Sequence, residues 1–169
     1  TEEEAKAKGW LPYSTVLPDR GCFFYDNYKE YIEDMAKTGQ NVYRLSLAWP
    51  RILPNGIGDV NPKGIEFYNK VINKLLSSGI EPFVDLYHWD LPSALQDKGG
   101  WLNRDIIPAF ARYAEVIVRH FRGRVKHYFT LNEPQCTTSL GYQQGIHAPG
   151  QRLSLPEVFR VHVNQMLAH

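Results

Sequence analysis

Residues 61–87 read NPKGIEFYNKVINKLLSSGIEPFVDLY, and this stretch decides the fold. Asn61 is a typical helix-capping residue, and Pro62 suits the first helical position that follows it. Apolar residues then recur at helical spacing as far as Gly79, where a glycine suits the end of a helix. Residues 81–87 form a short apolar and aromatic run that is typical of a strand. The stretch therefore predicts a helix followed closely by a strand.

The same pairing of helix and strand is predicted on both sides of this stretch. It gives helix 26–37 with strand 41–48, helix 105–120 with strand 125–131, and a capping box at Ser154 and Glu157 that opens a last helix still running at His169. The strands begin about 40 residues apart, which leaves room for a helical crossover between them. Strands joined by such crossovers pair in parallel, so we expect a parallel sheet.

Two α/β architectures fit this order of elements. A doubly wound sheet binds nucleotides at a glycine-rich turn, and neither G-x-G-x-x-G nor G-x-x-x-x-G-K-[ST] follows any of the three strands. The segments after the strands are rich in Trp, His, Asn, Pro and Glu, as in a barrel whose strand-end loops carry the chemistry. We therefore predict a partial (β/α)8 TIM barrel, incomplete in this chain because three strands cannot close a barrel of eight.

Residues 1–169 are predicted to form one such domain, although residues 1–25 contain no clear strand. Hydrophobic residues make up 43% of the chain and charged residues 22%, a composition that supports a packed core. The formal net charge is +1, and the positive residues are scattered. Nucleic acids and anionic membrane surfaces require a clustered basic face, and a membrane span requires about 20 apolar residues, so we expect neither partner.

The sequence predicts no bound metal or cofactor. Cys22 and Cys136 lie far apart, and two free thiols are favoured over a disulfide. The six histidines show no ligand spacing such as H-E-x-x-H, and no G-x-S-x-G motif marks a serine nucleophile. The N-terminus is charged rather than apolar and no N-x-[ST] sequon occurs, so the compartment stays open with a slight preference for the cytoplasm.

Polar residues stand at the ends of the predicted strands. Arg44 shares a strand face with Ser46, and a buried arginine needs a partner. A barrel lumen with carboxylates near its mouth and a structural ion pair at the surface explain Arg44 equally well. His88 and Trp89 follow the second strand and suit a sugar, because imidazole bonds hydroxyls and a flat indole covers the apolar face of a pyranose. A loop anchor is the plainer explanation of this pair.

Asn132, Glu133 and Pro134 end the third strand. A glutamate before proline cannot continue a strand ladder and points into a loop mouth. A carboxylic acid beside an amide fits general acid catalysis, in which Glu133 protonates a leaving oxygen while Asn132 holds a hydroxyl. For a lone strand-end glutamate, a solvated loop residue is the commoner case. A fourth stretch, residues 145–150, is rich in turn residues and is expected to be mostly structural.

Five stretches together resemble glycoside hydrolase family 1, the β-glucosidases. They are YRLSLAWPRILPNG at 43–56, GIEFYNKVINKLLSSGIEPFVDLYHWDLPSALQDKGGWLN at 64–103, FARYAEVIVRHF at 110–121, YFTLNEP at 128–134 and GYQQGIHAPG at 141–150. The resemblance runs from about residue 26 to the C-terminus, in family order and spacing, which makes it highly specific. Residues 1–25 diverge, because the family's opening strand with its glycone-binding glutamine has no match there.

The resemblance implies a retaining β-glycosidase and a role for each strand-end residue. Glu133 matches the acid/base, and Asn132 matches the residue that holds the sugar 2-hydroxyl. His88 and Trp89 match the glycone-binding pair, and Arg44 matches an arginine that neutralises and positions the nucleophile. The HWD form of the second strand end resembles the β-glucosidase branch rather than the phospho-sugar branch, which implies a plain glucoside or galactoside as substrate.

The family's nucleophile segment has no match in this chain. Retaining hydrolysis needs two carboxylates about 5–5.5 Å apart, and Asp85, Asp90 and Asp97 do not fit the nucleophile motif. The resemblance therefore implies that this chain supplies the acid/base half of a site and is inactive alone. The alternatives are a non-catalytic partial barrel that self-associates or meets a complementary C-terminal half, and a sugar-binding remnant. Nucleotide binding has only the α/β pattern in its favour.

Overall fold

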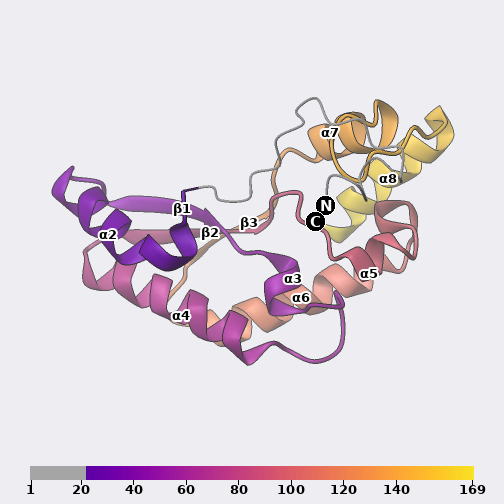
Figure 1. Ribbon diagram of the computed structural model, residues 1–169. Helices are drawn as coiled ribbons and strands as arrows, with labels where there is room; N and C mark the ends of the chain where they lie inside the picture. Colours follow the sequence, from indigo (N-terminus) through magenta and orange to yellow (C-terminus); the bar gives the residue numbers. More distant parts are fainter. Residues whose placement is uncertain (1–21) are drawn as a thin grey trace.

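The computed structural model describes residues 22–169 and contains three parallel strands with helices between them (Figure 1). The elements in chain order are α2 Phe24–Lys37, β1 Val42–Ser46, α3 Trp49–Ile52, α4 Pro62–Ser77, β2 Glu81–Tyr87, α5 Ser93–Gln96, the 3-10 helix η1 Gly100–Leu102, α6 Ile106–Phe121, β3 His127–Leu131, α7 Pro134–Cys136, the π-helix η2 Thr137–Gln143 and α8 Leu155–Ala168. Each long helix and strand predicted after residue 25 is present. The expectation for residues 1–21 lies outside the described residues.

The sheet has the parallel pairing that the sequence predicts, with β2 between β1 and β3. In register, Ser46 of β1 lies opposite Asp85 of β2, which lies opposite Phe129 of β3. The C-terminal ends of the three strands therefore meet at one edge of the sheet. Within residues 22–169 no further strand pairs with β1 or β3, so the sheet is open on both sides.

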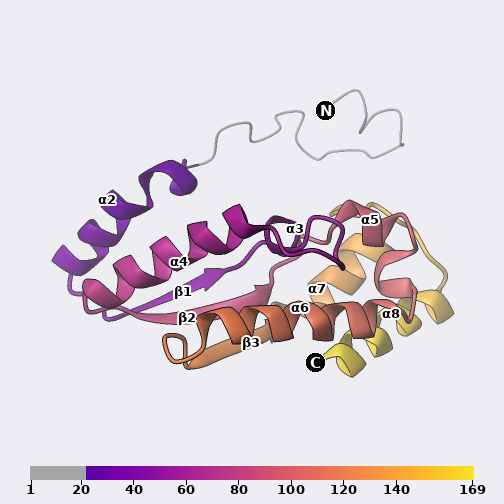
Figure 2. The same ribbon diagram turned by 90° about the horizontal axis from the view of Figure 1, so that it is seen from below.

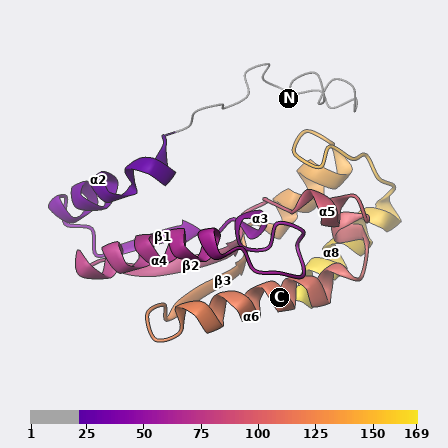
Figure 3. The same ribbon diagram turned by 60° about the horizontal axis from the view of Figure 1, so that its bottom comes forward.

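Helices α4 and α6 lie along one face of the sheet (Figures 1 and 2). Their apolar residues recur at helical spacing and are buried, and they pack against strand residues such as Leu45 and Val84. The buried helix residues include Ile65, Tyr68, Val71, Ile72 and Leu75 of α4 and Phe110, Tyr113 and Ile117 of α6. At the far end, α8 packs against α6, and the predicted capping box at Ser154 and Glu157 opens it (Figure 3).

Trp49 organises the chain directly after β1. Its side chain is fully buried and stacks on Tyr113 with ring centroids 5.0 Å apart, while its indole N–H donates to the Gly56 carbonyl at 3.0 Å. The Tyr113 hydroxyl in turn donates to the Leu47 carbonyl at 3.1 Å. The predicted strand 41–48 therefore ends early, at Ser46, and a short helix follows. Four helical residues carry no readable period, so the sequence did not reveal α3.

The other face of the sheet is bare in the described part of the chain. Val42 is 44% exposed, Phe129 is 45% exposed, and the Arg44 side chain is 46% exposed between them. The expectation that Arg44 lies on a buried strand face is wrong for β1 as described, because no element between residues 22 and 169 covers that face. In a closed (β/α)8 barrel the corresponding face lines the lumen.

Helix α4 approaches α3 so closely that Gly64 has no room for a side chain. A Cβ atom at this position would lie 2.1 Å from the backbone oxygen of Arg51. Alanine usually stabilises a helix interior by about 1 kcal/mol over glycine. Here we predict the opposite sign: Gly64→Ala lowers the free energy of unfolding by about 1–3 kcal/mol, because the backbone of α3 must move.

Urea denaturation of the chain measures this effect. Lys63→Ala is the matched control, because Lys63 is the exposed neighbour on the same helix and its replacement should change stability by less than about 0.5 kcal/mol. A Gly64→Ala variant as stable as the starting chain would contradict the packing of α4 on α3.

Candidate active site

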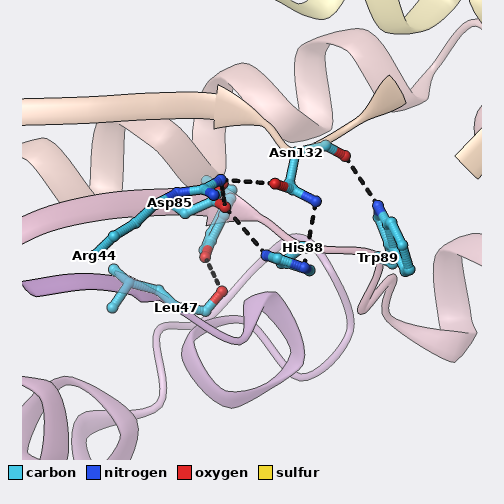
Figure 4. Close-up of polar contacts among 7 residues, drawn as sticks. Arg44, Leu47, Asp85, His88, Trp89 and Asn132 are labelled. Carbon is cyan, nitrogen blue, oxygen red and sulfur yellow. Dashed lines mark hydrogen bonds and ion pairs between the residues drawn. The ribbon is translucent and has the colours of Figure 1, made fainter. Parts of the chain in front are cut away.

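The register of the sheet brings two predicted sites together. Tyr87 of β2 lies opposite Leu131 of β3, so the residues that follow the two strands leave the sheet side by side. The Asn132 amide N–H extends the ladder by donating to the Tyr87 carbonyl at 2.9 Å. His88 and Asn132, which are 44 positions apart in the chain, thus face each other at the sheet edge (Figure 4).

Four side chains form a closed ring of polar contacts at this edge (Figure 4). The Arg44 guanidinium donates through one nitrogen, Nη2, to Asp85 Oδ2 at 2.6 Å and to Asn132 Oδ1 at 2.7 Å. The Asn132 Nδ2 atom lies 3.3 Å from His88 Nε2, and His88 Nδ1 lies 3.2 Å from the same Asp85 Oδ2. All three strands contribute to this ring, so its geometry depends on the sheet.

Trp89 is fixed beside this ring. Its backbone has a φ of 79°, in the left-handed region, and its indole N–H donates to the Asn132 carbonyl oxygen at 2.9 Å. The centroid of its indole lies 5.4 Å from that of the His88 ring and 5.4 Å from that of the His147 ring. The loop expected to be mostly structural, residues 145–150, therefore also borders the site through His147.

Glu133 follows Asn132 and is exposed. Its φ of 43° also lies in the left-handed region, and Pro134 begins α7 directly after it. A non-glycine residue in this conformation is uncommon and is found where surrounding structure holds it, often at functional sites. Local burial raises the pKa of the Cys136 thiol, and the Glu133 carboxylate beside this thiol acts in the same direction. Both Cys22 and Cys136 are free thiols.

Asp85 is the member of the site that sequence reasoning missed. Its side chain is 1% exposed, and burial raises its pKa, with the Arg44 guanidinium and then His88 acting in the opposite direction. Its other carboxylate oxygen, Oδ1, is buried without a hydrogen-bond partner. An available signal was the aspartate inside an otherwise apolar strand, because a buried carboxylate there requires a cation nearby.

The predicted residues therefore gather at one place. Arg44, His88, Trp89 and Asn132 contact one another directly or through Asp85, and Glu133 is the next residue in the chain. Arg44 pairs with the Asp85 carboxylate on the face that a barrel lumen would occupy and also reaches solvent, so both explanations for Arg44 fit the structure. Within residues 22–169 no three His, Cys, Asp or Glu side chains gather as metal ligands, and no helix could cross a membrane.

Comparison with known proteins identifies close relatives. The profile of the family described as glycosyl hydrolase family 1 matches residues 8–169. Beta-glucosidase A of Thermotoga maritima is 50% identical over 151 residues, which cover 89% of this chain and 34% of that protein. The 6-phospho-beta-glucosidase GmuD of Bacillus subtilis is 46% identical over 156 residues, 92% of this chain and 33% of that protein.

A solved structure shows the same fold. The family 1 β-glucosidase from Thermotoga maritima superposes with a TM-score of 0.91 at 48% identity, covering 94% of this chain and 36% of that one. The chain thus spans about a third of the length of the relatives it matches. The three described strands and their helices correspond to part of that enzyme's TIM barrel.

Asp90, which follows Trp89, generates a prediction on pH. Burial raises its pKa to about 6, against the opposing effect of nearby backbone N–H groups, and its Oδ1 atom has no partner. The folded chain holds the proton of the Asp90 carboxyl more tightly than the unfolded chain does. Protonated Asp90 therefore adds to the free energy of unfolding; this contribution is complete below about pH 4 and is lost as pH rises through about 6. Asp90→Asn removes this titration. Relative to the starting chain, it should gain up to about 3 kcal/mol of unfolding free energy between about pH 4 and 7.

Urea denaturation across this pH range tests the prediction. Glu66→Gln is a control of opposite sign, because Lys70 lowers the pKa of Glu66, so this exposed pair stabilises the folded chain only once the carboxylate ionises. Parallel stability curves for Asp90→Asn and the starting chain would show that Asp90 is not buried as described.

Proposed function

The chain belongs to glycosyl hydrolase family 1, and from this premise we propose that its 169 residues form the acid/base half of a retaining β-glucosidase site, with Glu133 as the proton donor. In the proposed reaction Glu133 first protonates the leaving oxygen of a β-glucoside. It then acts as the base that activates water against a glycosyl-enzyme intermediate. The observation that carries the proposal is the ring of Arg44, Asp85, His88 and Asn132, because Glu133 directly follows its member Asn132 in the chain.

The residues beside Glu133 suit a pyranose. The His88 side chain is 42% exposed, so its imidazole can bond sugar hydroxyls, and the Asn132 amide provides a donor and an acceptor next to it. The half-buried Trp89 presents an indole held by its hydrogen bond to the Asn132 carbonyl. Rigid aromatic and polar groups of this kind bind the apolar face and the hydroxyls of a sugar together.

Arg44 has a free side for a second carboxylate. Its guanidinium uses Nη2 for both of its hydrogen bonds in the ring and is 46% exposed on the bare face of the sheet. We place the nucleophile of the complete site in a segment outside these 169 residues, where Arg44 would neutralise and position it. In a retaining site that carboxylate would lie about 5–5.5 Å from Glu133.

The substrate proposal is a plain β-glucoside or a related β-glycoside. Solved complexes of the Thermotoga maritima enzyme contain glucoimidazole and galacto-hydroximolactam, inhibitors named for gluco and galacto configurations. The HWD sequence of residues 88–90 favours this class over a phosphorylated sugar, and the similarity to GmuD makes the distinction worth testing with both substrates.

A non-catalytic role is the second candidate. Val42 and Phe129 expose apolar surface on the bare face, and both outer strand edges are open within residues 22–169. Such surfaces favour self-association or pairing with a complementary barrel portion. Concentration-dependent sedimentation without glucose-dependent tryptophan fluorescence would support this reading, whereas glucose binding by the chain together with no hydrolysis in a completed barrel would support a sugar-binding remnant.

The purified 169-residue chain should not hydrolyse an aryl β-glucoside. With one carboxylate of the pair, no glycosyl-enzyme can form, so the chain and its Glu133→Gln variant should release aryl alcohol at the same background rate. Turnover by the chain that Glu133→Gln abolishes would contradict the half-site, because a second carboxylate would then lie within these residues or across a self-interface.

The role of Glu133 can be tested in a completed barrel. In a hybrid where residues 22–169 replace their counterparts in the Thermotoga maritima enzyme, Glu133→Gln should lower kcat/KM about 10²–10⁴-fold for an alkyl β-glucoside. A dinitrophenyl β-glucoside should lose far less, because its leaving group departs without a proton. Glu30→Gln, an exposed change on α2, is the control. An equal loss with both substrates would show that Glu133 does not donate the proton.

A further inference from the structure

The proposed reaction gives no role to the buried carboxylate of Asp85. It lies on the central strand with 1% of its side chain exposed, and its Oδ2 atom contacts both Arg44 and His88. A carboxylate in such a position is costly unless its partners are well placed. In the proposed site, Arg44 positions the nucleophile and His88 binds the sugar. Asp85 therefore acts on both of these roles through its contacts.

The ring of contacts fixes the orientation of the Asn132 amide. Arginine has only donors, so the Asn132 atom 2.7 Å from Arg44 Nη2 must be the carbonyl oxygen, Oδ1. The amide nitrogen, Nδ2, then points to His88, where it lies 3.3 Å from Nε2. The Asn132 backbone carbonyl also accepts from Trp89, so this residue is held at two points.

The orientation of Asn132 in turn selects the tautomer of a neutral His88 ring. The Nδ2 atom of an amide donates and cannot accept, so His88 Nε2 must present its lone pair to it. The ring proton therefore sits on Nδ1, which lies 3.2 Å from Asp85 Oδ2 and donates to it. In metal sites and catalytic triads a carboxylate fixes a histidine tautomer through the same kind of contact.

We propose that Asp85 is a positioning residue, which holds His88 as the Nδ1–H tautomer and turns the Arg44 guanidinium toward Asn132. His88 Nε2 is then an acceptor, and a sugar hydroxyl donates to it by sharing or displacing the 3.3 Å contact with Asn132 Nδ2. This last step rests on the proposed function, while the tautomer itself does not depend on any sugar.

Two substitutions test whether the hydrogen-bond acceptor of Asp85 matters, as distinct from the space that its side chain fills in the strand. Asp85→Val removes the acceptor, keeps the approximate size and suits a strand, and it leaves Arg44 able to reach solvent. Asp85→Asn keeps one carbonyl oxygen where Oδ2 lies, so it can still accept from His88 Nδ1. Only a positioning role predicts that the Asp85→Asn variant keeps the Nδ1–H tautomer of His88 and that the Asp85→Val variant loses it.

Nitrogen-15 NMR of the imidazole rings in the 169-residue chain reports the tautomer directly. We expect a protonated Nδ1 and an unprotonated Nε2 for His88 in the starting chain and in Asp85→Asn, and a shift toward protonated Nε2 in Asp85→Val. His147, which neighbours Trp89 and does not contact Asp85 in the ring, is the internal control and should keep the same signals throughout. A protonated Nε2 in the starting chain, or an unchanged His88 in folded Asp85→Val, overturns the inference.

Glucose titration of the same samples separates this inference from the proposed function. If glucose binds, Asp85→Val should weaken binding about tenfold, the loss of about one hydrogen bond, while Asp85→Asn retains it. Absence of glucose binding alongside the expected tautomers would count against the sugar site and leave the role of Asp85 standing. Glucose binding that is equal in all three chains, with unchanged tautomers, overturns the role of Asp85 and leaves the sugar site standing.

Discussion

The position of β2, paired in parallel on both sides, is the constraint on which the site depends. Its register sets Asp85 between Ser46 and Phe129 and makes His88 emerge beside Asn132. The Arg44–Asp85 and His88–Asn132 contacts then join residues 41 and 44 positions apart in sequence, and the Arg44–Asn132 contact joins residues 88 positions apart. A slip of one residue between β1 and β2 would turn Asp85 to the face opposite Arg44 and leave Arg44 without this partner.

Much of this arrangement could be predicted from sequence because it follows from repeated, local signals. Apolar residues at helical spacing mark α4 and α6, and the capping residues Asn61 and Ser154 mark helix starts that the structure confirms. Crossover helices imply parallel strands, and parallel strands imply that His88 and Asn132 share an edge. The family resemblance then supplied a functional role for each of these residues. From the residues alone, a structural explanation was equally good or better.

The rest could not be predicted because it depends on contacts between distant residues. Asp85 has no local signature apart from its apolar neighbours, and its partners come from other strands. The early end of β1 depends on Trp49 stacking against Tyr113, which no periodicity in residues 41–52 indicates. Arg44 has an exposed face because no element within residues 22–169 covers it, and composition carries no information on that.

We propose that these residues supply the proton donor and the sugar contacts, while the nucleophile comes from elsewhere in the barrel. We would label the Thermotoga maritima hybrid with cyclophellitol, a carbocyclic epoxide that is present in a solved complex of the Thermotoga enzyme and that a nucleophilic carboxylate can open with help from an acid. The account predicts a label on the Thermotoga portion, formed more slowly when Glu133 is changed to Gln. A label within residues 22–169, or a labelling rate that Glu133→Gln leaves unchanged, would contradict it.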